Sequence, residues 1–336
     1  MRHVYVLAGI WCMVWLHSCS GPAGKDIRDV KVDVSFSDLH LDLAGLDTQH
    51  VPSSIRHLQE KYGHFLPFFL SEIAALDTSN GYSDTMVSMF FTYRDLRNLH
   101  DTVAQVFSNT KEIRQQLTTL FKHIRAGDTS LTIPKHVIFY TSGLHHVAFT
   151  YEDTILGIGL DRFFGSGFWP YEAMNYPQYV TRNLIIDHIP IEAAKTIFHN
   201  KYGISYEDKN LLDLMIQEGK MLYFLRTVLP DFSDEQILGY TPGQLKWCAE
   251  NEVYIYKFFT DQNLFYEKSP TRIMRYIAPA PTSMGMPDQS PGRTGAYIGY
   301  QIIRSYAEKT GKSLYEILHT DNTQEIFNTA KYKPKR

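Results

Sequence analysis

Cysteine is scarce in this chain of 336 residues, which contains only Cys12, Cys19 and Cys248. Neither sign of charge is in excess, because 33 basic and 36 acidic residues leave a formal net charge of −3. The lack of a basic excess argues against a nucleic-acid partner. Apolar residues at 44% and charged residues at 21% argue against bulk disorder and against a protein with many membrane spans.

Short catalytic and cofactor-binding motifs are absent as well. The sequence contains no GxGxxG, no Walker loop, no GxSxG and no CxxC. No histidine is followed by glutamate, so the HExxH zinc motif is also missing. These patterns therefore support neither phosphate-binding nor redox chemistry, and we expect no cofactor.

The first residues have the pattern of a secretory signal. Arg2 and His3 precede an unbroken apolar run at 4–15. As a helix this run spans roughly 18 Å, which is short of the roughly 30 Å hydrocarbon core of a membrane. We therefore interpret residues 1–18 as a signal peptide and not as a membrane-spanning helix.

The signal ends in Leu-His-Ser-Cys at 16–19, which resembles a lipobox, although His17 departs from the usual small or apolar residue. In proteins with a lipobox, the Cys carries acyl chains such as palmitate and becomes the first mature residue. We therefore expect lipidation at Cys19, followed by a tether at 19–29. Ser20 resembles the pattern of outer-membrane lipoproteins. The alternative is an ordinary secreted protein in which Cys19 follows the signal by chance.

The rest of the chain, 30–336, is expected to form a single α+β domain that is mostly helical. Alternation of apolar and polar residues predicts a strand at 30–43. Three short β patterns at 136–141, 145–152 and 154–164 predict a three-stranded meander. Helical patterns cover most of the remainder, at 53–62, 84–107, 109–126, 177–200, 208–229, 241–262, 294–309, 313–319 and 322–330.

Aromatic residues are abundant, with 22 Tyr, 20 Phe and 4 Trp. They recur at spacings compatible with helices, as in FLPFF, MFFTY and YIYKFF. We interpret most of them as core residues, and the remainder as a possible surface for a partner.

His188 and Glu192 come closest to a metal-binding pattern, because residues four apart lie on one face of a helix. Glu218 on the next predicted helix would complete a set of one His and two Glu. However, Ile189 occupies the position of the general base, and Pro190 disturbs the helix. We favour the interpretation that these are ordinary helix residues, with zinc binding as the alternative.

Two further places carry candidate site residues. Asp161 and Arg162 follow the third predicted strand, where they form either a functional rim or a local salt bridge. Ser290 and Arg293 close the long Pro- and Gly-rich loop at 278–295, immediately before a helix. A helix N-terminus with an added Arg favours anions, and the alternative is a turn that only sets the angle of that helix.

Several segments in their order and spacing resemble the gliding-motility lipoprotein GldB family of the Bacteroidetes. The resemblance extends from the lipobox through VSFSDLHLDL, KYGHFLPFFL, LGIGLDRFFG, QEGKMLYFL and LGYTPGQLKWCAENE to SPGRTGAYIGYQIIRSY. The family is also distantly similar to zincin-type metallopeptidases. That similarity implies a degenerate zincin-like domain, with His188–Glu192 as the altered active helix and Glu218 as the relic of a ligand.

The resemblance implies a non-catalytic lipoprotein that is anchored in the membrane of the cell envelope. Its expected partners are other proteins of the gliding motility or type IX secretion machinery. Two alternatives remain open: a zinc metallopeptidase-like protein with an altered active site, and a lipoprotein that binds a small ligand.

Overall fold

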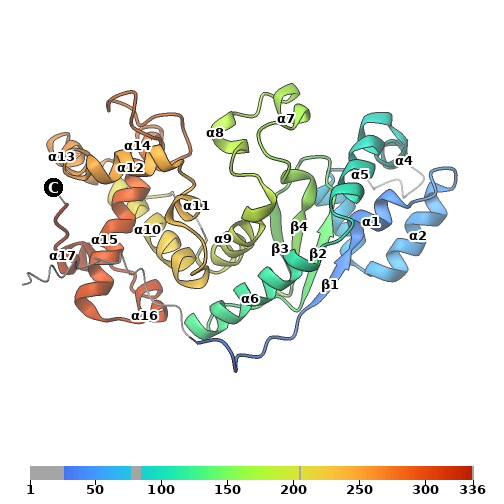
Figure 1. The fold of residues 1–336 in the computed structure, drawn as a ribbon, viewed down its shortest axis with the longest axis horizontal. Helices are drawn as coiled ribbons and strands as arrows, with labels where there is room; N and C mark the ends of the chain where they lie inside the picture. Colours follow the sequence, from blue (N-terminus) through green and yellow to red (C-terminus); the bar gives the residue numbers. More distant parts are fainter. Residues whose placement is uncertain (1–25, 77–84, 204–205, 335–336) are drawn as a thin grey trace, which may run out of the picture.

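A small β-sheet and a larger set of helices make up the fold (Figure 1). The computed structural model describes residues 26–76, 85–203 and 206–334. The predicted signal peptide, the lipobox with Cys19 and most of the tether lie outside these residues. In the described part of the chain, no helix has both the length and the hydropathy that a membrane crossing needs.

The sheet has four strands in the spatial order β1-β2-β4-β3. β1 pairs parallel with β2, and β2 pairs parallel with β4, whereas β3 pairs antiparallel with β4. The predicted three-stranded meander is therefore wrong, although its three strands exist. The chain after β2 forms β3 at the edge of the sheet and then returns, so β4 lies between β2 and β3. The strands are Ser35–Asp38 (β1), His136–Tyr140 (β2), Ala148–Tyr151 (β3) and Ile155–Gly159 (β4).

Helices cover both faces of the sheet, so β2 and β4 are apolar along most of their length. Side chains of a strand alternate between its faces. Val137 and Phe139 of β2 accordingly join the core that also contains α6 and α9. Ile138 and Tyr140 join a second core, formed with the helices between β1 and α5. That second group of helices comprises α1 (Leu39–Ala44), α2 (Val51–Tyr62), α3 (Phe65–Phe68), the π-helix η1 (Phe69–Ile73) and α4 (Thr85–Thr92).

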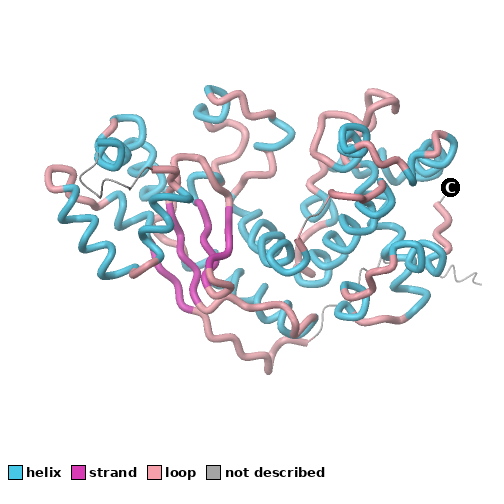
Figure 2. The backbone as a smooth tube through the Cα atoms, turned by 180° about the vertical axis from the view of Figure 1, so that it is seen from behind, coloured by secondary structure: helices cyan, strands magenta, loops and turns pink. Residues whose placement is uncertain are grey.

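The remaining helices begin with α5 and α6, and most of them form the half of the molecule away from the sheet (Figures 1 and 2). That half contains no strand in the described residues. The helices are α5 (Arg94–Val106), α6 (Lys111–Gly127), η2 (Leu160–Arg162), α7 (Trp169–Ala173), α8 (Gln178–Thr181), η3 (Ile186–His188), α9 (Ile189–Tyr202), α10 (Leu211–Val228), α11 (Asp234–Leu238), α12 (Pro242–Glu250), α13 (Glu252–Asp261), η4 (Leu264–Tyr266), α14 (Pro270–Ile277), α15 (Thr294–Thr310), α16 (Leu314–Leu318) and α17 (Thr323–Ala330).

The centre of the helical half is the crossing of α10 and α15. The two helices meet at Gly219 and Gly299, where the backbones lie so close that no side chain fits. A Cβ built on Gly299 would lie 1.8 Å from the carbonyl oxygen of Met215. Gly219 therefore has a packing role beside Glu218, independent of any role for that carboxylate.

Several predicted elements are divided differently in the structure. The strand predicted at 30–43 is confirmed only for β1, because Leu39 begins a helix that buries Leu39 and Leu43 on one face. The helix predicted at 177–200 is three pieces, α8, η3 and α9. Pro190 does not interrupt α9 but lies in its first turn. A backbone N–H at that position has no acceptor within the helix, so the lack of an N–H in proline costs no hydrogen bond.

Candidate functional site

A cleft of about 240 Å³ lies between the segment at 147–195 and the helical half of the molecule. Its walls come from three parts of the chain that lie apart in the sequence. They are residues 147–195, residues 236–244 around the turn between α11 and α12, and both ends of the long loop before α15. Four lining residues are cationic and one is acidic. They are Arg162, Arg182, Lys195, Arg293 and Glu192.

Arg162 lies in the first of these walls, directly after β4. Its Nη1 donates to the carbonyl oxygen of Leu144 at 2.6 Å and to the hydroxyl of Tyr176 at 2.8 Å. Its guanidinium also lies 4.7 Å from the centre of the Tyr176 ring. The residue is only 6% exposed, and its Nε has no partner among the described residues. Arg162 is therefore a buried cation whose direct partners are neutral.

Asp161, the residue before Arg162, is fully buried. Its Oδ2 accepts from the backbone N–H groups of Ser142 and Leu144, at 3.0 and 2.6 Å. Burial raises the pKa of Asp161 to about 6, because desolvation outweighs these hydrogen bonds and the charge of Arg162. No ion pair joins Asp161 to Arg162 within the described residues, so the local salt bridge considered from the sequence does not form.

Arg182 is the second cation that lacks a charged partner. Its Nη2 donates to the side-chain oxygen of Gln244 at 2.8 Å and to the carbonyl oxygen of Gly239 at 3.2 Å. The same Gln244 oxygen accepts from the backbone N–H of Thr241, as part of the capping box of α12. Burial lowers the pKa of Arg182, and its Nε has no partner in the part of the chain that the structure describes.

His188 and Glu192 both line the cleft, at the start of α9. His188 is the N-cap of α9, and Glu192 lies in the first turn of that helix. Burial lowers the pKa of His188, and the positive charge of Lys195 lowers it further. Glu192 is already paired, because Lys195 Nζ lies 2.8 Å from its Oε1.

Glu218 and Arg293 form the second ion pair at the cleft, with 3.0 Å between Nη2 and Oε2. Arg293 is the N-cap of α15 and has a left-handed backbone with φ 62°. Its Nη1 donates to the carbonyl oxygen of Leu238 at the end of α11. Arg293 therefore joins α10, α11 and α15 at one wall of the cleft.

The three residues considered for zinc do not fit a zinc ion as they are arranged. A tetrahedral site needs free ligand atoms that converge on one point. Glu192 and Glu218 each hold a cation instead, Lys195 and Arg293 respectively. Across the described ranges, no group of three or more His, Cys, Asp or Glu side chains could hold a metal ion.

Ser290 is buried in the long loop and does not line the cleft. It is 1% exposed, and its Oγ has no partner in the described residues. The next residues, Pro291 and Gly292, do line the cleft. The loop is fastened there because the Tyr240 hydroxyl donates to the carbonyl oxygen of Gly292 at 3.0 Å.

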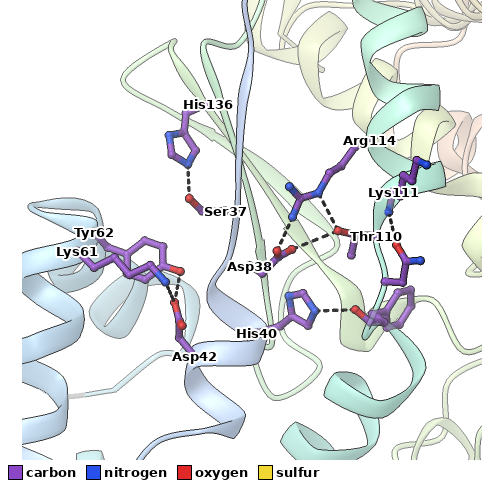
Figure 3. A network of polar contacts seen from close by, with 12 residues as sticks. Ser37, Asp38, His40, Asp42, Lys61, Tyr62, Thr110, Lys111, Arg114 and His136 are labelled. Atoms are coloured by element: carbon purple, nitrogen blue, oxygen red, sulfur yellow. Dashed lines mark hydrogen bonds and ion pairs between the residues drawn. The ribbon is translucent and has the colours of Figure 1, made fainter.

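A second polar cluster lies at the end of β1 and has a structural role (Figure 3). Arg114 and Thr110 of the α6 region point toward Asp38, which is the N-cap of α1. Lys61 and Tyr62 of α2 point toward Asp42 of α1. Because each carboxylate is used to hold a neighbouring helix, this cluster fastens α1 between α2 and α6.

Comparison with models of known protein families shows the family to which the chain belongs. The family model described as gliding motility protein GldB matches residues 21–334. The chain belongs to the GldB family. Searches of curated proteins and of solved structures found no match.

In this GldB chain, the structure brings together residues that the sequence suggested separately. Arg162, His188, Glu192 and Arg293 all line the one cleft, and Glu218 contacts it through Arg293. Asp161 is buried and does not line the cleft. Ser290 comes immediately before the lining residues Pro291 and Gly292. Sequence reasoning missed Arg182 and Lys195, since neither belongs to a recognisable pattern.

Proposed function

We propose that this protein is a non-catalytic, lipid-anchored component of the gliding motility or type IX secretion machinery. It acts through contacts with other proteins of that machinery. The observation that carries the proposal is the match of the GldB model over residues 21–334. The pairing of Glu192 with Lys195 and of Glu218 with Arg293 supports the non-catalytic role, since neither carboxylate is free to act as a base.

Anchoring through Cys19 is the part of the proposal that can be tested first. Palmitate labelling in the native host is expected for the wild type and for Cys12→Ala, but not for Cys19→Ala. Cys12 is the matched control, because it belongs to the predicted signal peptide. Cys19→Ala is also expected to lose motility or secretion while the protein still folds. Equal labelling of all three proteins, or full function of a soluble periplasmic form, would contradict the proposal. Ser20 supports placement in the outer membrane, which fractionation of the membranes tests.

A zincin-derived metallopeptidase is the second candidate, because His188 and Glu192 line the same cleft. It requires stoichiometric zinc in the purified protein and loss of function in a His188→Ala/Glu218→Ala double variant. Metal analysis of the protein as isolated separates the two candidates. Stoichiometric zinc would favour the peptidase and count against the contact role.

A further inference from the structure

We propose that the cleft binds a carboxylate presented by an acidic peptide segment, with Arg162 and Arg182 as the groups that recognise it. Arginine is suited to this task because its planar fork matches the two oxygens of a carboxylate.

The positive charges that line the cleft are only partly compensated. Lys195 and Arg293 are neutralised by Glu192 and Glu218. Arg162 and Arg182 have no carboxylate within ion-pair distance among the described residues, and Asp161 acts on Arg162 only over a longer range. Two largely buried guanidiniums therefore face a cleft without direct compensation. Burying a charge is unfavourable unless it is paired, so an anion is the expected occupant.

Hydrogen bonds already hold both arginines in position. Arg182 is fixed by Gln244 and Gly239, and Arg162 by Leu144 and Tyr176. Each uses one Nη atom for these hydrogen bonds, and neither Nε has a partner in the described chain. A guanidinium that is held in place loses less side-chain entropy when a ligand arrives. These contacts place both cations before any ligand binds.

The other walls favour a peptide over inorganic phosphate. Side-chain amides of Asn183, Gln236 and Gln244 line the cleft and can donate to or accept from a peptide backbone. Apolar side chains lie between them, namely Val147, Val180, Leu184 and Ile191. A small, strongly hydrated phosphate would leave the apolar part of the wall without a contact. A peptide segment can contact both kinds of surface.

Calorimetric titration of the full-length protein, purified in a neutral detergent, tests the proposal. The probe is acetyl-tetraglutamate amide, and acetyl-tetraglutamine amide and inorganic phosphate are the comparison ligands. We expect saturable binding of the glutamate peptide alone, which weakens as salt is added. Arg182→Gln is expected to lower the affinity about tenfold or more, because it removes a charge-assisted contact.

Arg275→Gln is the matched control variant, because Arg275 is exposed on α14 and does not line the cleft. It is expected to bind like the wild type. If Arg182→Gln does not fold, Arg182→Lys decides the question, since it keeps the charge but loses the planar fork and is expected to bind more weakly. Lack of binding, equal binding of the glutamine peptide, binding of phosphate only, or unchanged affinity in the folded Arg182 variants would each overturn the proposal. Because this titration does not measure motility, its failure leaves the proposed function untouched, and the reverse also holds.

Discussion

Asp161 illustrates how a single residue at the end of a strand is controlled by its surroundings. It has no exposed surface, and two backbone N–H groups and the Ser142 hydroxyl donate to one of its oxygens. The other oxygen, Oδ1, has no partner in the described part of the chain. Burial raises its pKa to about 6, from an ordinary value of 3.8. The folded protein therefore holds this proton more tightly than the unfolded chain does.

This pKa predicts a pH dependence that Asp161→Asn should remove. The stabilisation from the bound proton is complete below the unfolded pKa and is lost as the pH rises through the folded pKa. The wild type should lose up to a few kcal/mol relative to Asp161→Asn between pH 4 and 7, at about 1.4 kcal/mol per pKa unit. Urea unfolding of both proteins at the two pH values measures this. The exposed Asp288→Asn is the control, and a constant difference between Asp161→Asn and wild type would contradict the prediction.

Cys248 should be chemically inert in the folded protein. It is fully buried, and burial raises its pKa to about 12, so almost no thiolate is present near neutral pH. In a Cys12→Ala/Cys19→Ala background, a maleimide reagent should label Cys248 only after denaturation. Labelling of the native protein at the rate of a free thiol would show that the site is open.

At the scale of elements, cap residues predict where helices begin more accurately than the alternation of apolar and polar residues predicts strands. Capping boxes begin α10, α11, α12 and α16 in the structure, and Thr241-Pro242 predicts the start of α12 correctly. Alternation at 30–43 predicted one strand but concealed the start of α1. A short run of apolar and polar residues fits both the two-residue period of a strand and the 3.6-residue period of a helix. Packing of α1 against β2 and α5 selects the helix.

A single added methyl group should strongly disturb the packing of α10 against α15. Gly299→Ala would place Cβ against the Met215 carbonyl, so the helices must move apart. We expect a loss of about 3 kcal/mol in the free energy of unfolding, as for other overpacked cores. Gly167→Ala is the matched control, because a Cβ at that position would have no atom within 4 Å, and it should change stability by less than about 0.5 kcal/mol. Equal unfolding midpoints for the two variants would contradict this packing argument.

At the scale of the whole molecule, the cleft is held together by contacts between its distant walls. Arg182 joins the segment before α9 to α11 and α12, while Arg293 joins α15 to α10 and α11. The walls are thus tied by polar contacts of side chains, in addition to the apolar cores beneath them.

Removing the charge of Glu218 should therefore weaken the molecule as a whole. The Glu218–Arg293 pair is largely buried, and breaking it leaves a guanidinium without its counter-ion. Glu218→Gln should lower the free energy of unfolding by about 1–2 kcal/mol in chemical denaturation. Glu250→Gln, which removes the exposed pair with Lys246, should have almost no effect. Equal losses in the free energy of unfolding for the two variants would show that the Glu218–Arg293 pair stabilises the fold no more than an exposed ion pair does.

The sequence by itself determined the family, the largely helical class and most helix positions, because these depend on local periodicity, caps and the order of segments. The tertiary structure decided the strand order and the membership of the cleft. The parallel pairing of β1 with β2 joins residues as distant in the sequence as Ser35 and His136, and no local pattern records it. Likewise, Arg182 and Arg293 line one cleft only because the segment before α9 and the loop before α15 fold together. Charge compensation is a property of neighbours in space, which is why the paired and unpaired arginines could be told apart only in the folded molecule.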